Sequence, residues 1–443
     1  MARLFGTDGI RGVANADLTP ELAFRVGRAA GAVLGGQVPV VIGRDTRVSG
    51  PMLEAALAAG LCSVGVSAAL AGILPTPAVA YLARAQQRSG VVVSASHNPV
   101  EDNGIKLFGA DGFKLPDAVE ERIEAWLARD DLPRPTGTGL GTVVPLPDAE
   151  DRYLGYLLGL AGGRLDGVRV VVDCAYGAAV RVAPQLWQAL GATVIALHAV
   201  PDGARINVGC GSTHLAPLQA AVRAHGADVG FAHDGDADRV LAVDERGEVV
   251  DGDALMGICA LDRCTRGLLP GAVVVATVMS NAGLEDALRA AGVRLERTRV
   301  GDRYVLERMR EVGAVLGGEQ SGHLVFLDRA TTGDGLVTAL EVVNVMLRTG
   351  RRLSELRAAI PRYPQVLVNV RVRRRDGVLE APEVAAAIRA AQGRLRDGGR
   401  ILVRPSGTEP VIRIMVEATR QDLAEALAAE VAEAVARAAG GTP

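Results

Sequence analysis

Three times along the chain, an apolar stretch rich in valine runs into a polar turn and is followed by a helical pattern. These stretches are PVVIGRDTR (39–47), VRVVVDCAYGA (168–178) and AVVVATVMSNAG (272–283). Apolar β-branched runs that alternate with helices are typical of parallel-rich sheets, whose functional loops lie at the strand ends. This recurrence restricts the chain to α/β architecture.

Each of these units contains a second feature, a strand that leads into a polar loop and returns as a strand. The segments are VVVSASHNPVEDNGIKLF (91–108), VGFAHDGDADRVLAV (229–243) and AVLGGEQSGHLVFL (314–327). A fixed-period repeat is absent, so the chain is not a solenoid. We therefore predict three similar mixed α/β domains, each with one functional loop.

The C-terminal segment has a different order of elements: strand, helix, two strands and a final helix. Thr419 and Asp422 predict a capping box for that helix. A Pro- and Gly-rich stretch (130–150) predicts a linker, and fainter breaks occur near 249–253 and 360–365. The last domain is therefore expected to be α+β. The predicted domains are residues 1–148, 149–250, 251–362 and 363–443.

Composition limits the partners and the compartment. The net charge of −3 gives no general attraction to nucleic acid or to anionic membranes, so any phosphate must be recognised locally. Residues 55–83 carry no charge, but their glycines and prolines favour a helix, a strand and a second helix over a membrane span. Five cysteines without CxxC spacing and the absence of a secretory signal lead us to expect reduced thiols and a cytoplasmic protein.

Lysine is almost absent from this chain. Of 48 basic residues, only Lys106 and Lys114 are lysine, and both follow the polar loop at 94–99. A lysine can be tuned to lose its proton near neutral pH, whereas an arginine cannot. A chemical role for these lysines and chance retention as surface charge are equally well supported at this point.

The loop SASHNP (94–99) places a hydroxyl between a buried strand and a proline-terminated turn. Ser96 is therefore a candidate nucleophile. A serine-hydrolase elbow, G-x-S-x-G, does not occur here. The alternative is a polar turn in which Asn98 and Pro99 serve turn geometry.

The loop DGDADR (234–239) places Asp234, Asp236 and Asp238 at alternate positions between two strands. Carboxylates packed so closely repel each other unless a cation neutralises them, and hard oxygen ligands suit Mg²⁺ or Ca²⁺. An EF-hand would place Glu245 at its twelfth position, but Arg239 stands where that loop needs glycine. A solvated acidic turn is the other alternative.

Two further loops carry polar groups. Glu319, Ser321 and His323 lie in one glycine-flanked loop that could bond sugar hydroxyls and move a proton. The segment RPSGTEP (404–410), followed by Arg413, has the donors of an anion site but is not a Walker loop. A structural histidine and a tight turn with solvated arginines are the respective alternatives.

A cationic set lies near the start of the chain: Arg11, Arg44 and Arg47. Such arginines could bind an anion. Ion pairing with Asp8 and Asp45 is the alternative, and for Arg47 it is equally well supported.

In this order, the four loops resemble those of the α-D-phosphohexomutase superfamily along the whole chain. Within it, FGTDGIRG (5–12), CGSTH (210–214), VGDRYV (300–305) and GEQSGH (318–323) resemble the phosphoglucosamine mutase family. Arg205 departs from the asparagine usual in that family. The resemblance implies three mutase-type α/β domains and a TBP-like last domain around a central cleft.

The resemblance also implies roles for individual residues. Ser96 would carry the phosphate as phosphoserine and, with the three loop aspartates, hold one Mg²⁺. Proton transfer in such a reaction needs groups that can titrate, and His323 and Lys106 are our candidates for it, with Arg11 as electrostatic support. The implied sugar and phosphate ligands are Glu319, Ser321, Arg404, Ser406, Gly407, Thr408 and Arg413.

The implied activity, of the isomerase class, interconverts glucosamine 6-phosphate and glucosamine 1-phosphate through a 1,6-bisphosphate. Its product would enter UDP-N-acetylglucosamine and peptidoglycan synthesis. The expected partner is a small sugar phosphate, and neither nucleic acid nor a membrane is expected to bind. A homodimer is a possible oligomeric state. Two alternatives are a phosphomannomutase or phosphoglucomutase, and a non-catalytic Ca²⁺- or sugar-phosphate-binding module.

Overall fold

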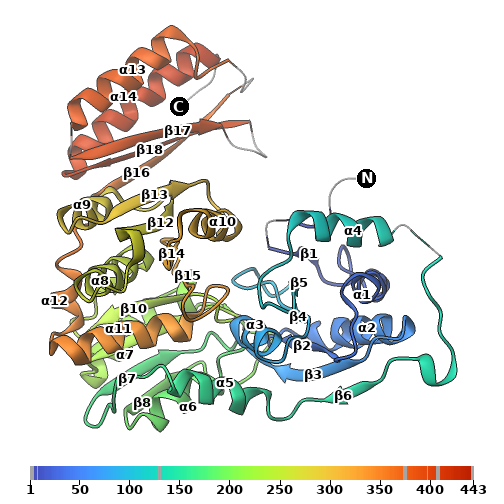
Figure 1. Cartoon of the computed structure of the whole chain (residues 1–443). Coiled ribbons are helices and arrows are strands. Elements are labelled where there is room, and N and C mark those ends of the chain that lie inside the picture. The colour runs from blue at the N-terminus through green and yellow to red at the C-terminus, as the bar shows by residue number, and fades with distance from the viewer. Residues whose placement is uncertain are drawn as a thin grey trace. The chain divides into compact units, whose positions relative to one another are not determined.

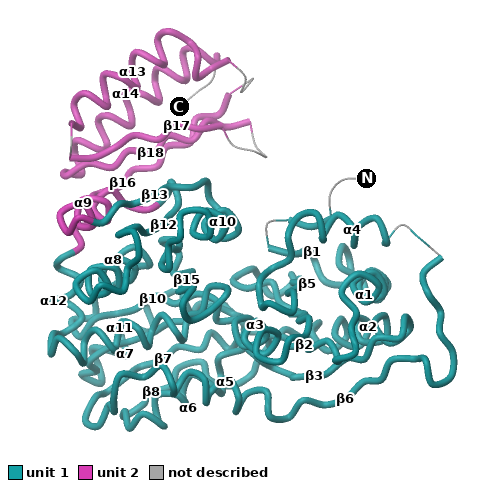
Figure 2. Tube along the Cα trace, viewed as in Figure 1, with its two compact units in different colours: residues 1–279, 293–359 teal, residues 280–292, 360–443 magenta. Residues whose placement is uncertain are grey.

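The computed structural model describes residues 4–6, 8–127, 129, 131–372, 377–396, 398–405 and 410–440 (Figure 1). Contacts divide the chain into two compact units (Figure 2). The first unit comprises residues 1–279 and 293–359, and the second comprises residues 280–292 and 360–443. The first unit contains three mixed sheets and the second contains one antiparallel sheet.

The three sheets of the first unit repeat one strand order: β3-β2-β4-β5, β8-β7-β9-β10 and β13-β12-β14-β15. In each order, the second strand runs parallel to both of its neighbours, and the fourth strand pairs antiparallel with the third. The prediction of three similar α/β domains is thus confirmed. The strands are β2 (Val40–Arg44), β3 (Ala68–Ile73), β4 (Gly90–Val93), β5 (Asp102–Phe108), β7 (Arg169–Asp173), β8 (Thr193–Leu197), β9 (Val229–His233), β10 (Val240–Asp244), β12 (Val273–Thr277), β13 (Arg294–Thr298), β14 (Leu316–Gly318) and β15 (Leu324–Phe326).

Three edge strands extend these sheets: β1 (Ile10–Val13) and β6 (Val143–Pro145) in the first, and β11 (Val249–Val250) in the second. Strand β6 lies inside the stretch predicted to be a linker and pairs parallel with β3. The prediction was therefore wrong for this part. Proline does not exclude a strand at this position, because an edge strand tolerates a residue that lacks an N–H donor.

Helices cover both faces of the first sheet. Val40 and Ile42 of β2 pack in one cluster with α1 and α2, whereas a Cβ at Gly43 would meet Val79 of α3 on the opposite face, at 2.6 Å. The helices of the first unit are α1 (Pro20–Leu34), α2 (Gly50–Ser63), α3 (Thr76–Ala85), α4 (Asp117–Leu127), α5 (Ala149–Leu158), α6 (Val182–Ala189), α7 (Ala216–His225), α8 (Gly252–Thr265), α10 (Asp302–Val312), α11 (Gly335–Thr349) and α12 (Leu353–Arg357). Its short 3₁₀ helices are η1 (Gly137–Gly139), η2 (Gly211–Thr213) and η3 (Pro270–Ala272).

The uncharged stretch 55–83 forms the end of α2, the strand β3 and most of α3, as predicted. Glycine and proline interrupt it where helix and strand change over. In the described part of the chain, no helix combines the length and the apolar character that crossing a membrane requires.

The antiparallel end of each sheet positions the functional loops. The loop between β4 and β5 contains Ser96, the loop between β9 and β10 contains residues 234–239, and the loop between β14 and β15 contains residues 319–323. Because these strands have short connections, each polar loop is held at both ends by a buried ladder. The three loops are thereby presented at equivalent positions of three similar sheets.

The second unit is a three-stranded antiparallel sheet of order β16-β18-β17, with an apolar core shared by two helices. Helix α9 belongs to this unit because the carboxylate of buried Glu417 accepts the Ala282 N–H at 2.9 Å and the Arg400 Nε at 2.7 Å. The elements are α9 (Ala282–Ala290), β16 (Gln365–Arg371), α13 (Pro382–Leu395), β17 (Gly399–Pro405), β18 (Val411–Ala418) and α14 (Gln421–Ala439).

The capping box predicted from Thr419 and Asp422 does not form. Helix α14 begins at Gln421, and its N-cap residue, Arg420, makes no side-chain capping bond. The Asp422 carboxylate instead accepts the Arg420 Nε at 2.9 Å. A charged neighbour competed successfully for the carboxylate that the capping box would have used.

Candidate active site

Ser96 lies where the first and second domains meet. Its Oγ donates to Asp234 Oδ2 at 2.6 Å, and its side chain is fully buried. The residue has a φ of +55°, a left-handed conformation that costs a non-glycine residue roughly 1 kcal/mol or more. Such strain concentrates at functional positions and persists only when surrounding contacts enforce it.

Arg47 supplies much of that enforcement. It is completely buried, and its Nε donates to Asp45 at 3.0 Å. Its Nη2 donates to the carbonyl oxygens of Ser96 at 3.1 Å and Asn98 at 2.8 Å. Of the two interpretations of Arg47, the structure thus favours the ion pair, with the added task of holding the serine loop. Arg44 pairs with Glu54 at 3.2 Å.

The three loop aspartates lie together, all buried. Burial and then the charges of Asp238 and Asp236 raise the pKa of Asp234 well above its usual value. One oxygen each of Asp236 and Asp238, the Oδ1 atom, is buried without a hydrogen-bond partner among the described residues. Crowded, incompletely paired hard oxygens are what a divalent cation such as Mg²⁺ requires. The cluster therefore fits a metal ion.

The EF-hand alternative is excluded by the flanking elements. Residues on both sides of the loop are the strands β9 and β10, not helices. Glu245 points its carboxylate elsewhere, where it accepts the Ser354 hydroxyl at 2.5 Å. A solvated acidic turn is excluded as well, because the three aspartates are at most 3% exposed.

Lys106 is a buried cation that offsets the negative charge of this cluster, together with Arg239 and His323. Its Nζ lies 2.8 Å from Asp236, 3.3 Å from Asp238 and 3.0 Å from Asp8, and the side chain is 1% exposed. Burial lowers its pKa, but the three carboxylates outweigh burial and raise it well above the usual value. The geometry therefore supports an ammonium ion with an electrostatic role. Its predicted role in proton transfer stays a prediction.

If the activity implied by the resemblance holds, we expect Lys106→Met to lower turnover of the sugar phosphate by about 10²-fold or more, because the substitution removes a buried cation from the carboxylates beside Ser96. Without Mg²⁺ the thermal midpoint should also fall, since the carboxylates lose a buried counter-ion. Adding Mg²⁺ should recover most of the stability but not the turnover. Steady-state kinetics and thermal unfolding with and without Mg²⁺ measure both.

The matched control is Arg164→Met, which breaks an exposed ion pair with Asp166 at 2.7 Å and should change neither quantity appreciably. Turnover by Lys106→Met within about threefold of the wild type would contradict the electrostatic role.

His323 is held between two carboxylates. Its Nδ1 lies 3.6 Å from Asp238 Oδ2 and its Nε2 lies 3.7 Å from Asp302 Oδ2. Burial lowers the pKa of the imidazole, but these carboxylates, Asp238 first, bring it above the usual value. A Cβ at Gly333 would lie 2.4 Å from the ring, so only glycine allows this packing. A histidine in this setting can hold and release a proton.

A carboxylate network that the sequence analysis missed joins the first and third domains. Lys114 Nζ bonds both Asp8 and Asp302, and Asp8 also bonds Arg11. The lysine scarcity was the one signal that pointed to Lys114. The sequence suggested Asp8 only as an ion-pair partner of an arginine and suggested no role for Asp302. Their bonds to Lys114 span 106 and 188 residues, so no local pattern indicates them.

The loops line a pocket of about 470 Å³ in the first unit. Four of the predicted site residues line this pocket: Arg11, Asp238, Glu319 and His323. Ser96 is not a lining residue, but the next residue in the sequence, His97, is. The lining residues are Leu4, Gly6, Asp8, Gly9, Arg11, His97, Asp238, Arg239, Val300, Gly301, Asp302, Glu319 and His323. Acidic and basic groups from three domains thus converge on one polar pocket.

The predicted sugar ligands differ in their placement. Glu319 lines the pocket, and its Oε1 accepts the Gly301 N–H at 3.1 Å. Ser321 is not among the lining residues, and its buried Oγ has no hydrogen-bond partner in the described part of the chain. Sugar binding by both residues therefore stays a prediction.

The predicted phosphate ligands belong to the second unit. Arg404 of β17 lies directly opposite Arg413 of β18 in the antiparallel ladder. Residues directly opposite each other in an antiparallel pair have their side chains on the same face of the sheet, and phosphate binding by Arg404 and Arg413 stays a prediction. Ser406, Gly407 and Thr408 lie outside the described residues, and their roles stay predictions.

Family models for all four parts of one fold match this chain. They describe the phosphoglucomutase/phosphomannomutase α/β/α domains I, II and III, and the C-terminal domain of that family. The matched residues are 2–134, 152–247, 251–363 and 367–434, respectively.

Individual proteins give the same assignment. A phosphoglucosamine mutase of Moorella thermoacetica is 61% identical over 94% of this chain and 95% of its own length. A phosphoglucomutase/phosphomannomutase family protein of Burkholderia thailandensis has a solved structure with TM-score 0.82, 27% identity and coverage of 98% and 97%. The Aspergillus fumigatus N-acetylphosphoglucosamine mutase, solved with GlcNAc-6P and magnesium, shares the fold (TM-score 0.65, 20% identity, coverage 98% and 96%). The chain therefore belongs to the phosphoglucosamine mutases within the phosphoglucomutase/phosphomannomutase family.

Proposed function

We propose that this protein interconverts glucosamine 6-phosphate and glucosamine 1-phosphate through phosphorylated Ser96. The observation that carries the proposal is the Ser96 hydroxyl, held 2.6 Å from Asp234 in a cluster of buried carboxylates beside a polar pocket. The identity with curated phosphoglucosamine mutases, 61% for the Moorella protein, supports the choice of sugar.

In the proposed first step, the phosphoryl group passes from Ser96 Oγ to the O1 oxygen of glucosamine 6-phosphate. The O1 hydroxyl gives its proton to a base as the O1–P bond forms, and Ser96 Oγ takes up a proton as the Oγ–P bond breaks. The resulting 1,6-bisphosphate turns round, and its 6-phosphoryl group passes to Ser96 Oγ, which gives up its proton while the sugar O6 oxygen takes one up. Glucosamine 1-phosphate then leaves. His323, at the pocket and between two carboxylates, is the proposed proton carrier.

Asp234, Asp236 and Asp238 would hold Mg²⁺, which when bound supplies positive charge beside the transferring phosphoryl group. Lys106 adds a fixed positive charge to the same carboxylates. Arg11 lines the pocket and donates through Nη1 to Asn98 Oδ1 at 3.0 Å, which orients its guanidinium at the serine loop. These residues together stabilise developing negative charge.

Several finer statements belong to the same proposal. Glu319 and Ser321 would bind the sugar, and Arg404 and Arg413, with the loop between their strands, would bind its non-reacting phosphate. The 1,6-bisphosphate would act as intermediate and activator, and one Mg²⁺ would serve each subunit. A cytoplasmic location, a homodimer, the predicted domain boundaries and a product that feeds UDP-N-acetylglucosamine synthesis complete the proposal.

Turnover of a panel of sugar phosphates tests the function directly. With Mg²⁺ and a trace of the matching 1,6-bisphosphate, we expect glucosamine 6-phosphate to be turned over at least about tenfold more efficiently than mannose or glucose phosphates. Preference for mannose or glucose phosphate would move the activity to a sister family. If the phosphorylated protein turned over none of the three, a mutase function would be excluded.

A further inference from the structure

Asn207 connects the second domain to the backbone of the serine loop. Its side-chain Nδ2 donates to the carbonyl oxygen of Ser96 at 2.9 Å and, more weakly, to that of Asn98 at 3.4 Å. The Ser96 bond spans 111 residues of sequence. Asn207 Oδ1 is buried and makes no hydrogen bond with the described residues, so the amide acts here as a donor alone.

The two hydrogen bonds to the Ser96 carbonyl oxygen fix the backbone from which the serine hydroxyl projects. This carbonyl belongs to a left-handed residue, and its other donor is the Arg47 guanidinium at 3.1 Å. One donor thus comes from the serine's own domain and one from the domain that carries the metal loop. A strained backbone whose hydroxyl must face Asp234 is set from both sides of the domain boundary.

The metal loop approaches the same carbonyl. A Cβ at Gly235 would lie 2.5 Å from the Ser96 oxygen and 3.0 Å from Asn207 Nδ2. Only glycine therefore leaves room for the bond between Asn207 and Ser96. The serine loop, the metal loop and Asn207 meet at this one point.

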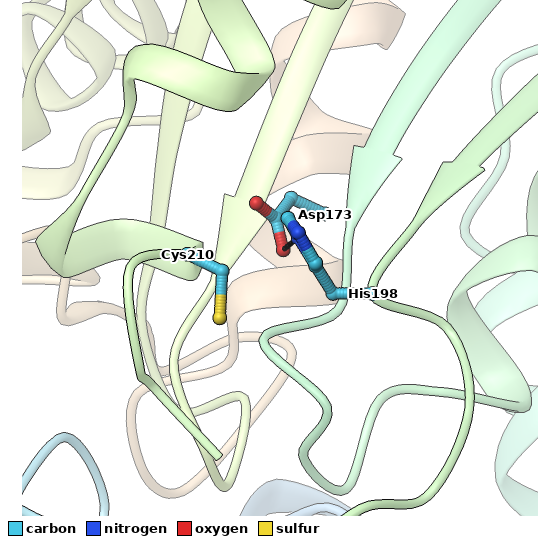
Figure 3. A group of neighbouring side chains, drawn as sticks. All are labelled: Asp173, His198 and Cys210. Carbon is cyan, nitrogen blue, oxygen red and sulfur yellow. Dashed lines mark ion pairs between the residues drawn. The ribbon is translucent and has the colours of Figure 1, made fainter. Parts of the chain in front are cut away.

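Asn207 is itself anchored by Asp173, which is fully buried at the end of β7 (Figure 3). The Asp173 carboxylate accepts the N–H groups of Ala175 at 2.9 Å and Gly211 at 3.0 Å, and the Ala175 carbonyl accepts the Asn207 N–H at 3.1 Å. One carboxylate thus holds the segment at Ala175, which binds the Asn207 N–H, and the segment at Gly211, four residues after Asn207.

Two further side chains lie beside the Asp173 carboxylate. His198 Nδ1 lies 3.0 Å from Asp173 Oδ1, with its imidazole beside the carboxylate, and the buried Cys210 thiol lies close by (Figure 3). Burial and then the Asp173 charge raise the pKa of Cys210 to about 12, which keeps the thiol neutral. Both Asp173 oxygens are already engaged by backbone N–H groups, so we assign the cluster to anchoring the loop.

We propose that Asn207 is a positioning residue of the mutase reaction: it holds the Ser96 backbone so that the serine hydroxyl faces Asp234 and the metal site. This inference rests on the proposed function. It extends it by giving the second domain a part in orienting the nucleophile, in addition to its metal ligands.

Two substitutions separate donation by the side chain from backbone conformation. Asn207→Asp keeps the shape but lacks the N–H donor, and Asn207→Gly keeps the left-handed backbone, whose φ is +62°. The matched control is Asn344→Asp, because the Asn344 amide also donates to a carbonyl, that of Leu160, at 2.9 Å. That bond involves no residue of the pocket or of the metal cluster.

We expect both Asn207 variants to lower kcat by about 30- to 100-fold, because small displacements of a nucleophile are costly. KM should stay within about threefold, since the pocket is unchanged. Hydrogen exchange of the peptide containing residues 94–99 should accelerate in the unphosphorylated protein. The Asn344→Asp control should keep kcat within about twofold of the wild type, and its unfolding midpoint should shift by about as much as those of the Asn207 variants.

Wild-type kcat and unchanged exchange in both Asn207 variants would overturn the proposal. So would a kcat loss matched by a fall in unfolding midpoint far beyond that of the control, which would indicate a purely structural role. If the wild type failed to turn over glucosamine 6-phosphate, the proposed function would fall by itself. The exchange comparison would still decide whether Asn207 positions the serine loop.

Discussion

Ser96→Ala is expected to abolish mutase turnover, by at least about 10⁴-fold, because it removes the oxygen that accepts and donates the phosphoryl group. The fold should survive, since the Ser96 backbone remains held through its carbonyl by Arg47 and Asn207. Steady-state turnover of glucosamine 6-phosphate and mass spectrometry of the intact protein check both statements. The wild type should carry one phosphate that the variant cannot acquire.

The control for this substitution is Ser63→Ala, which removes a hydroxyl at the end of α2 bonded to the Gly60 carbonyl at 2.7 Å. It should keep turnover within about twofold of the wild type. Retention of substantial turnover by Ser96→Ala would show that the phosphoryl group is not carried on this residue. The pocket would then need another nucleophile.

Asp234→Asn is expected to act in opposite directions on stability and activity. Burial and two neighbouring carboxylates raise the pKa of Asp234, so its charge opposes folding when no metal is bound. Without Mg²⁺ the variant should therefore unfold at the same or a higher temperature than the wild type. With Mg²⁺ the wild type should gain stability, about 2.7 kcal/mol at a hundredfold excess over Kd, and the variant should gain little.

Turnover of Asp234→Asn should fall by at least about 10³-fold, because a metal ligand and the hydrogen-bond partner of Ser96 are both altered. A chelator should produce a comparable loss in the wild type, reversed by adding Mg²⁺. Thermal unfolding across a Mg²⁺ titration, with calorimetry for affinity, measures the effects. Asp166→Asn, at an exposed ion pair, is the control.

Equal Mg²⁺-induced stabilisation of the wild type and Asp234→Asn would contradict the assignment of the metal to this loop. Loss of stability in the variant without Mg²⁺ would contradict the repulsion argument instead. The two outcomes are independent, so the site and its electrostatics are tested separately.

Local pattern determined the secondary structure and the loops of this protein. The valine-rich runs became β2, β7 and β12, and each returning strand became the antiparallel edge of its sheet. Side-chain period and turn chemistry act over a few residues, so they can be read without knowing the fold. The motif order along the chain likewise indicated the family before any contact was known.

Local pattern failed where a residue had a choice of partners. Residues 143–145 joined a sheet because the edge of β3 was available to them. Asp422 paired with Arg420 instead of capping a helix. Arg47 had two plausible roles until its burial excluded solvent and ligand from it.

Only the tertiary structure decided how the site is assembled. The Ser96 hydroxyl meets Asp234 across 138 residues, Lys106 meets Asp236 across 130, and Asn207 meets Ser96 across 111. Which carboxylate faces which cation sets their pKa values, and that depends on burial and separations of about 3 Å. Sequence spacing carries no information about such distances, because the relative placement of the three sheets determines them.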